Sequence, residues 1–282
     1  MTARFDAVTQ AMMQTNQVNW DARTPIHAAS RFYGLDGTRS PFYWFAPFEW
    51  EDLGELSGRD VLHLQCHLGT ETAAFAHKGA RTVGLDFSAA AVAKARQLAR
   101  KAGVEVEYVR SNVYDAVNAL GERRFDVIYT GKGALCYLPD LTAWATVAAQ
   151  LLRPGGQLYL VEFHPLLTAL DPAPQQESGP HLLLRHDYLQ GRGAQQNAAG
   201  YTYTDGPAVS EATVSYEWAH GIGEVVDALI EAGLRITRLR ETPAIPWRRW
   251  EEMVATDDGW WRLPDSAPRV PLPYALRASK QE

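Results

Sequence analysis

Short apolar runs alternate with segments of helical periodicity through the middle of the chain. Five of these runs have the length and the apolar composition of buried β-strands. They are residues 61–65, 81–85, 104–109, 125–129 and 157–162. Strands that alternate with helices predict parallel β-α-β units, with helices on both faces of the sheet. Because such crossovers are right-handed, we predict an α/β fold with a doubly wound, Rossmann-like sheet.

Capping and stop residues mark the predicted helices between these strands. The segment 70–78 is followed by Gly79, and Ser88 is placed to cap a helix that runs to Ala102 and stops at Gly103. A third helix is expected at 140–151, where the following Arg-Pro-Gly-Gly at 153–156 should break it. Helices of this length are the crossovers that parallel strands require.

The C-terminal part of the chain predicts two further strands and a change of direction. A helix at 222–232 ends at Gly233, and strands are expected at 235–240 and 273–278. The last strand follows a turn-rich stretch instead of a crossover helix, so it can pair antiparallel with its neighbour. We therefore predict a mostly parallel, seven-stranded sheet with an antiparallel C-terminal strand.

Two segments outside this alternation are expected to be additions to a single domain that spans 1–282. Residues 1–58 contain helix-like segments and many aromatic residues, which predicts an N-terminal helical cap. Residues 164–218 are rich in proline and glycine and include β-rich pieces at 182–189 and 213–218. This composition predicts an inserted hairpin or lid segment.

Composition and charge narrow the class of protein. The chain has 282 residues, of which 46% are hydrophobic, and a formal net charge of −6. An acidic balance argues against nucleic acid or a membrane surface as the partner, since both need a basic face. Cys66 and Cys136 have no metal-ligand spacing, and no apolar run approaches the roughly 20 residues of a membrane span. We expect a cytoplasmic protein with reduced thiols.

The stretch 61–70 and the acid that follows it carry the first sign of chemistry. The stretch is a strand, a tight turn and the start of a helix, and Asp86 ends the next strand 86 − 69 = 17 positions after Gly69. A carboxylate at this place can accept hydrogen bonds from both hydroxyls of a ribose. The spacing predicts a nucleoside site across the first two strand ends.

From about Asp60 to the C-terminus the chain resembles the class I S-adenosylmethionine-dependent methyltransferases. The resemblance lies in the loop 61–70, the acidic strand end 83–88, Val-Arg-Ser-Asn-Val at 109–113, Phe-Asp-Val-Ile-Tyr at 125–129 and Leu-Leu-Arg-Pro-Gly-Gly at 151–156. The segments 62–67, 162–165, 215–218 and 246–249 are similar to a bacterial subgroup of that family. The resemblance implies methyl transfer from S-adenosylmethionine, which becomes S-adenosylhomocysteine, to a small-molecule acceptor through oxygen, nitrogen or carbon.

The resemblance also implies which residues bind the cofactor. Asp86 should hold the ribose, Phe87 should pack on the adenine, and Asn112 with Val113 should contact the adenine edge. Thr130 and Gly131 should lie beneath the methionine moiety. The complete expected set is His63, Gln65, Cys66, His67, Gly69, Asp86, Phe87, Ser88, Asn112, Val113, Thr130 and Gly131.

The loop departs from the family pattern acid-x-Gly-x-Gly-x-Gly. His63 replaces the acid, and Gln65 and His67 replace the first two glycines, so that Gly69 alone remains. Bulky side chains here would obstruct the pyrophosphate of a dinucleotide, whereas S-adenosylmethionine carries no phosphate. No metal is expected, because His63 and His67 lie on a strand and its turn without a third ligand nearby.

Residues for the acceptor and for proton transfer are less defined by the pattern. A general base is needed only if the acceptor loses a proton, and His164 at the end of the fifth strand is the best placed candidate, ahead of His186 and His220. The acceptor pocket is expected to include Trp20, Tyr188, Trp218 and Arg248, with Arg185 a further candidate. An aromatic side chain such as Trp20 also suits a sulfonium cation.

Two other classes of protein stay open at this point. One is an NAD(P)-dependent oxidoreductase on the same kind of sheet, and the other is a protein that binds S-adenosylmethionine without turnover. Enzymes of this fold that methylate amines of nucleic acids usually carry Asn/Asp-Pro-Pro-Tyr/Phe after the fourth strand. This chain has Thr-Gly-Lys-Gly at 130–133 instead, which argues against a nucleic-acid substrate.

Overall fold

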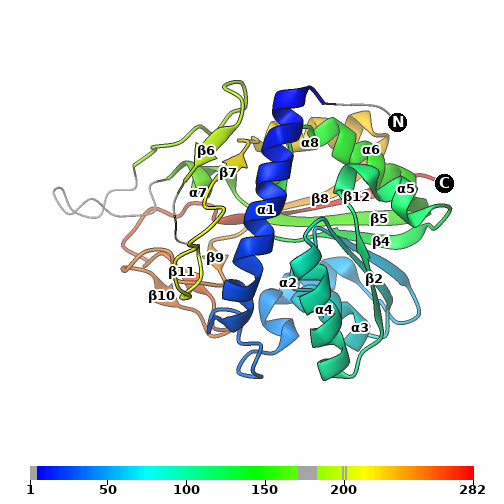
Figure 1. The fold of residues 1–282 in the computed structure, drawn as a ribbon, viewed down its shortest axis with the longest axis horizontal. Coiled ribbons are helices and arrows are strands. Elements are labelled where there is room, and N and C mark those ends of the chain that lie inside the picture. The colour runs from blue at the N-terminus through cyan, green and yellow to red at the C-terminus, as the bar shows by residue number, and fades with distance from the viewer. Residues whose placement is uncertain (1–4, 171–182, 199, 201) are drawn as a thin grey trace.

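A computed structural model describes residues 5–170, 183–198, 200 and 202–282. Its centre is a seven-stranded sheet in the order β3-β2-β1-β4-β5-β12-β8 (Figure 1). The bounds are β1 Asp60–Leu64, β2 Arg81–Asp86, β3 Val106–Arg110, β4 Phe125–Thr130, β5 Leu152–Phe163, β8 Leu234–Glu241 and β12 Pro273–Lys280. The first five strands pair in parallel, and β12 lies antiparallel between β5 and β8. The predicted fold class is confirmed, including the antiparallel C-terminal strand.

Helices cover both faces of the sheet, and alternate residues of each strand point to different helices. Leu62 and Leu64 face a cluster that contains Trp144 of α6 (Leu141–Leu151) and Leu229 of α8 (Ile222–Glu231). Val61 faces the opposite cluster, which includes Phe45 and Phe75. That second face is covered by η1 (Pro41–Trp44), α2 (Pro47–Leu53) and α3 (Thr70–His77). The core is therefore split in two by the sheet, as a doubly wound fold requires.

The remaining elements are short or lie outside the sheet. They are α1 (Ala7–Ala29), α4 (Ala89–Ala102), η2 (Val113–Asp115), α5 (Ala116–Leu120), η3 (Leu135–Tyr137), α7 (Pro165–Ala169), β6 (Gln195–Asn197), β7 (Ser215–Glu217), β9 (Ala244–Ile245), β10 (Val254–Ala255) and β11 (Trp261–Arg262). The predicted caps of α4 and α6 are present, with Ser88 accepting from the N–H of Ala91 and Asp140 from that of Ala143.

The long helix α1 crosses the front of the molecule beside α4 and β7 (Figure 1). Its Gln17 Nε2 donates to the carbonyl of Phe87 at 3.1 Å, and its Asp21 accepts from the hydroxyl of Ser88 and from the N–H of Ala90. On another face of α1, the side chain of Asn16 forms a pair of hydrogen bonds with the backbone of Tyr216 in β7. The helix is thus fixed over the carboxyl end of β2. That residues 1–58 act as a cap and 164–218 as a lid stays a prediction.

Local expectations failed at three places. Helix α6 ends at Leu151, as predicted, but β5 begins at Leu152 instead of 157, and its pairing with β4 is irregular between Leu152 and Gln157. Of the β-rich piece 182–189, residue 182 lies outside the described residues, and the rest contains only an isolated bridge between Leu184 and Leu170. The other predicted β-rich piece, 213–218, does contain a strand, β7. The turn-rich stretch 247–271 includes β10 and β11, which form a small sheet with β9. Strands of two residues are too short for a periodic pattern.

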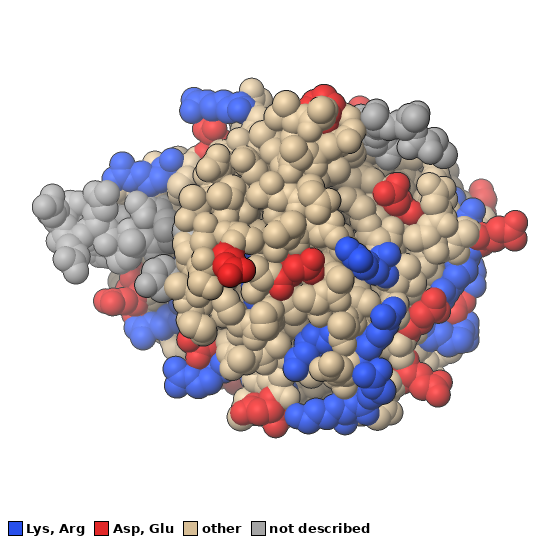
Figure 2. All heavy atoms as spheres, in the orientation of Figure 1, with Lys and Arg blue, Asp and Glu red and all other residues tan. Residues whose placement is uncertain are grey.

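The surface seen in Figure 2 has an uneven distribution of charge. Lys and Arg side chains gather over α4, which carries Lys94, Arg96, Arg100 and Lys101 and no acidic residue. Within the part of the chain that the structure describes, no helix has both the length and the apolar character that crossing a membrane requires.

Candidate active site

A cavity of about 360 Å³ lies at the carboxyl ends of the parallel strands, beneath α1. Its size is in the range of small-molecule sites. The end of β1 contributes Gln65, β2 contributes Asp86, and β4 contributes Gly131. Parallel strands bring their carboxyl ends to one edge of the sheet, so residues far apart in sequence meet here.

The loop after β1 keeps a left-handed backbone although two of its residues are not glycine. The φ angles are 55° at Gln65, 46° at His67 and 72° at Gly69. Side chains other than glycine rarely adopt this region, and strain of this kind collects at functional sites. At Gly69 a Cβ would overlap the ring and hydroxyl of Tyr108, so this position has no room for a side chain. The turn therefore places two large side chains where the family pattern has glycines.

Asp86 closes the corner between this loop and β2. Its two carboxylate oxygens accept from the backbone N–H groups of His67 and Ser88, each at 2.8 Å. The residue is 5% exposed and lines the cavity. Burial raises the pKa of Asp86 to about 6, against the opposing effect of these backbone hydrogen bonds. Each carboxylate oxygen has a further lone pair, which suits the two hydroxyls of a ribose.

Phe87, Asn112 and Val113 continue the wall from Asp86 toward β3. Asn112 is the N-cap of η2, where its Oδ1 accepts from the N–H of Tyr114 at 3.1 Å. These three residues, with Asp86, were expected to surround the adenosine. The structure brings all four to one cavity.

A group of rings closes the cavity under α1. The imidazoles of His27 and His67 are joined by a 3.0 Å hydrogen bond. The indole of Trp20 lies 4.9 Å from the His67 ring and 5.3 Å from the Tyr137 ring, centroid to centroid. Burial lowers the pKa of His27 to about 3 and that of His67 well below its usual value, so both rings are neutral. Trp20 was expected in the acceptor pocket, and it does line the cavity.

Below the loop, the cavity floor carries a histidine and a buried ion pair. His63 Nδ1 lies 2.8 Å from the hydroxyl of Thr72, and burial lowers the pKa of His63 to about 3. Lys132 binds Glu49 at 3.0 Å, with the two side chains 6% and 0% exposed. A pair of this kind is kept by its mutual attraction and by further hydrogen bonds. Lys132 also donates to the carbonyl of Trp44 at 2.9 Å, so its ammonium is already engaged.

The far end of the cavity is mainly aromatic. The rings of Phe163 and Trp247 meet edge to face with 4.7 Å between centroids, and Phe32 packs 6.4 Å from Trp247. The polar groups here are few. One is Thr168 of α7, and another is Arg249, whose Nη2 donates to the carbonyls of Leu167 and Leu170.

Three residues expected to contact the cofactor lie behind the cavity wall. Gly69 packs on Tyr108, Ser88 is fully buried against Asp21, and Thr130 is fully buried in β4. The cavity is lined instead by the other nine residues of the expected set, which are His63, Gln65, Cys66, His67, Asp86, Phe87, Asn112, Val113 and Gly131.

His164 also lies outside the cavity lining. Its Nε2 lies 2.9 Å from a carboxylate oxygen of Glu241 in β8, and its Nδ1 accepts from the N–H of Leu166 at 3.0 Å. Burial lowers the pKa of His164, and Glu241 acts in the opposite direction. Both ring nitrogens are therefore engaged in capping α7 and joining it to the antiparallel part of the sheet.

The other expected acceptor residues are dispersed. Trp218 is buried, and its backbone N–H donates to the carbonyl of Cys136 at 2.7 Å. Tyr188 packs near Gly221. The guanidinium of Arg248 lies 5.4 Å from the ring centroid of Trp261. Of the remaining histidines, His220 is held by Glu224 and by the carbonyl of Leu138. The cavity lining includes none of these four residues, nor His186 or Arg185.

Several cavity residues were missed by sequence reasoning. They are Met13, Asn16, Phe32, Tyr33, Trp44, Thr70, Glu71, Tyr114, Lys132, Gly133, Ala134, Cys136, Tyr137, Leu138, Phe163, Thr168, Tyr203, Glu217, Pro246, Trp247 and Arg249. The aromatic density before residue 50 was a usable signal for three of them. Glu71 was also detectable, because it directly follows the loop and lies in the first turn of α3.

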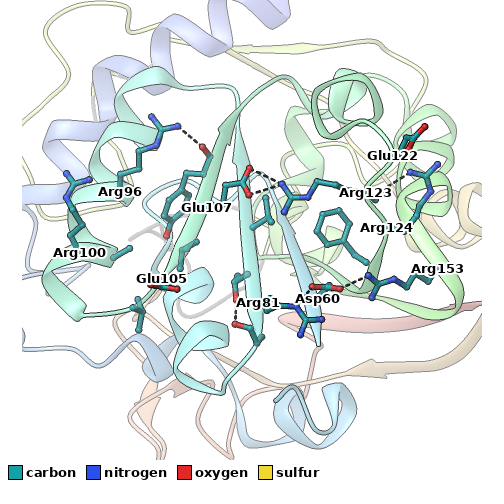
Figure 3. Close-up of a pocket in the computed structure, with 18 residues that line it drawn as sticks. Asp60, Arg81, Arg96, Arg100, Glu105, Glu107, Glu122, Arg123, Arg124 and Arg153 are labelled. Carbon is teal, nitrogen blue, oxygen red and sulfur yellow. Dashed lines mark hydrogen bonds and ion pairs between the residues drawn. The ribbon is translucent and has the colours of Figure 1, made fainter. Parts of the chain in front are cut away.

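A second hollow lies at the opposite, amino end of the strands and is strongly charged (Figure 3). Asp60 receives hydrogen bonds from Arg81 at 2.6 Å and from Arg153 at 2.5 Å, while Arg123 pairs with Glu107 at 2.8 Å. We call this surface the charged groove. These five labelled side chains are paired with one another.

Comparison with known proteins finds a methyltransferase domain and relatives that are named as methyltransferases. A family model described as "Methyltransferase domain" matches residues 62–158. The chain is 30% identical over 157 residues to the ubiquinone biosynthesis O-methyltransferase of Escherichia coli O7:K1, a match that covers 54% of this chain and 64% of the relative. The chain thus aligns with less than two thirds of that curated relative.

Solved structures share the fold. A structure described as an S-adenosylmethionine dependent methyltransferase from Listeria monocytogenes superposes with a TM-score of 0.58 at 19% identity, over 83% of this chain and 98% of the other. The magnesium protoporphyrin IX methyltransferase of Synechocystis PCC 6803 with bound SAH has a TM-score of 0.53 at 15% identity, over 98% and 100%. With the order of the seven strands, these likenesses show that the chain has the fold of S-adenosylmethionine-dependent methyltransferases, and the methyltransferase family model matches its residues 62–158.

Proposed function

We propose that this protein is an enzyme that transfers the methyl group of S-adenosylmethionine to a small-molecule acceptor with a flat, apolar body. The observation that carries the proposal is the buried Asp86 carboxylate at the end of β2, which faces a cavity of about 360 Å³. A carboxylate at the second strand end is the group that holds a ribose in nucleoside sites of this fold.

The nine expected residues that line the cavity divide between the two ends of the cofactor. Asp86 would bind the ribose, and Phe87, Asn112 and Val113 would enclose the adenine. Gly131, His63, Gln65, Cys66 and His67 would lie along the methionine tail. Gly69, Ser88 and Thr130 would support these residues from behind, since each is packed against the cavity wall.

When bound, the cofactor supplies a methyl group on a positively charged sulfur that is a good leaving group. Held at its ribose by Asp86 and at its adenine by Asn112, the cofactor would present that methyl group to the nucleophile of the acceptor. The work of the protein is alignment and exclusion of water. Trp20 and Tyr137 would serve both purposes, because their rings close the cavity and can face a cation.

The shape of the acceptor is inferred from the aromatic end of the cavity. Phe32, Phe163 and Trp247 offer ring faces and edges to a flat molecule, and Thr168 offers a hydroxyl to orient it. The relatives agree with a planar acceptor, since one is named for ubiquinone biosynthesis and another for magnesium protoporphyrin IX. In this proposal residues 1–58 are a cap and 164–218 a lid over the acceptor.

We extend the proposal to partners and location. A net charge of −6 and a cavity closed by rings favour a small molecule over nucleic acid or a membrane surface as the partner. Cys66 and Cys136 are free thiols, which fits a reducing compartment such as the cytoplasm.

The two alternatives differ from the proposal in what they bind and do. An NAD(P)-dependent oxidoreductase would need the pyrophosphate to approach the loop backbone at 65–67, where Gln65 and His67 project side chains. A protein that binds S-adenosylmethionine without turnover would share the cofactor site and lack only the reaction.

Calorimetric titration with S-adenosylmethionine, S-adenosylhomocysteine and NAD tests the proposal directly. We expect S-adenosylmethionine and S-adenosylhomocysteine to bind and NAD to give no measurable heat of binding. Binding of NAD alone would reject the proposal. Turnover against a panel of planar phenols, amines and carboxylic acids then separates an enzyme from a non-catalytic binder.

A further inference from the structure

The cavity floor beside β1 has an imidazole where the family pattern has an acid. His63 occupies that position, and its ring is 2% exposed. Burial, followed by the positive charge of Lys132, lowers the pKa of His63 to about 3. A neutral ring with one nitrogen on Thr72 offers no negative charge to a ligand. The amino-acid tail of S-adenosylmethionine carries an ammonium, which needs an anionic or strongly polar partner when it leaves water.

Glu71 places a carboxylate at this end of the cavity. It lies in the first turn of α3, directly after the loop 61–70, and it lines the cavity. A Cβ built on Gly131 would lie 3.6 Å from Glu71 Oε1 and 3.5 Å from His63 Nε2. The open side of Gly131 is therefore bordered by both groups, and the carboxylate reaches the space that an acid at position 63 would serve.

The Glu71 carboxylate is not neutralised by the protein. Its Oε2 accepts a hydrogen bond from the hydroxyl of Thr70 at 2.5 Å. Within residues 5–170, 183–198, 200 and 202–282, no Lys, Arg or His nitrogen lies within the 4.0 Å of an ion pair with Glu71. Lys132 is the nearby cation in the lining, and its ammonium is engaged by Glu49 and by the carbonyl of Trp44.

Gln65 presents an acceptor atom without a donor to the same cavity. Gln65 Nε2 donates to the carbonyl of Ala134 at 2.9 Å, which fixes the amide. Its Oε1 is buried and has no hydrogen-bond partner in the described chain. Buried polar atoms are rarely left unpaired, and where the protein supplies no partner, a water, an ion or a ligand completes them.

The other lining carboxylates are already placed. Asp86 lies at the end of β2, beside the ribose position, where it accepts from two backbone N–H groups. Glu217 lies on β7, where it accepts from the hydroxyl of Tyr137 at 3.2 Å. Glu71 thus remains as the negative charge over β1.

We propose that Glu71 binds the ammonium of the cofactor's amino-acid tail, in place of the acid that is absent at position 63. The inference rests on the proposed function, since it assigns one end of the same cofactor. The three N–H groups of the ammonium would be shared between the Glu71 carboxylate and neighbouring acceptors such as Gln65 Oε1. Charge-assisted hydrogen bonds of this kind are the strong ones.

The test compares ligands that differ only in the tail. S-adenosylhomocysteine carries the whole tail, its deaminated analogue lacks the ammonium, and 5′-methylthioadenosine lacks the tail altogether. Calorimetry measures their dissociation constants with the wild type, Glu71→Gln and the matched cavity variant Glu217→Gln. For Glu71→Gln we expect S-adenosylhomocysteine to bind roughly ten- to a hundredfold more weakly, and 5′-methylthioadenosine to change less than about twofold. For Glu217→Gln the ratio of the two constants should stay at its wild-type value.

Each outcome has a distinct meaning. An unchanged ratio in Glu71→Gln overturns the assignment of Glu71 and leaves the proposed function standing. Failure of the wild type to bind both S-adenosylhomocysteine and 5′-methylthioadenosine rejects the proposed function itself. Should Glu71→Gln not fold, the wild type alone decides: equal affinity for S-adenosylhomocysteine and its deaminated analogue overturns the inference, and a loss of tenfold or more supports it.

Discussion

The two ends of the parallel strands carry carboxylates in opposite circumstances. At the amino ends, Asp60 lies in the charged groove, where the hydrogen bond from Arg81 comes first among the causes that lower its pKa to about 2 (Figure 3). At the carboxyl ends, burial raises the pKa of Asp86 to about 6. The protein thus favours the ionised form of Asp60, whereas burial makes the ionised form of Asp86 less favourable than it is in water.

This difference separates a structural network from a binding site. In the charged groove, Arg123 and Glu107 pair with 42% and 55% of their side chains exposed, so that water screens what the partner does not neutralise. In the cavity, Asp86 and Glu71 have hydrogen-bond donors but no cation partner in the described chain. Charge by itself does not mark a site. A buried charge that has no counter-charge from the protein is the better indicator of a binding site.

The largest expected effect comes from Asp86→Ala. It removes the carboxylate that would bind the ribose, and we expect the affinity for S-adenosylhomocysteine to fall by about 1–3 kcal/mol, the usual loss for a hydrogen bond to a charged group. Isothermal titration calorimetry measures the change. An unaltered dissociation constant in a folded variant would show that the ribose assignment is wrong.

A pH series sharpens the contrast in the intact protein. Because the cofactor hydroxyls need the ionised Asp86, binding should be strongest above the pKa of about 6 and weaken as the carboxyl takes up a proton. One pH unit below that pKa, the dissociation constant should be roughly tenfold higher than its value at neutral pH. The control is Asp86→Asn, whose affinity should be weak and should not follow this titration. A wild-type affinity that is constant across the range would contradict the role of Asp86.

The smallest effect is expected from the charged groove and concerns stability. The folded pKa of Asp60 is depressed to about 2 from its ordinary value of 3.8, so its contribution to stability is present above that unfolded value and lost as pH falls toward 2. After solvent screening, Asp60→Asn should lower the free energy of unfolding by about 1 kcal/mol at neutral pH and less in acid. Urea denaturation at two pH values measures this. The affinity for S-adenosylhomocysteine should not change, and a loss of affinity comparable to that of Asp86→Ala would break the comparison between the two ends.

Local patterns were sufficient for the elements that form the sheet and for the acid at its edge. The seven strands, the caps of α4 and α6 and the position of Asp86 depend on the spacing of apolar residues and on short capping contacts, which neighbours in sequence supply. The antiparallel direction of β12 also followed from a missing crossover helix. The family resemblance then placed nine cofactor candidates that line one cavity.

What the pattern could not supply is the assembly of distant segments around the cavity. His164 ends β5 as expected, but the insertion of β12 between β5 and β8 turns its ring toward Glu241 and away from the cavity. Trp247 and Tyr203 reach the cavity from loops without periodicity, and Glu71 reaches it only because the left-handed turn at 65–69 starts α3 over β1. Element type is a property of local spacing. Which side chains share a cavity depends on the order of the strands and the paths of the loops, and these are set by packing between residues far apart in the chain.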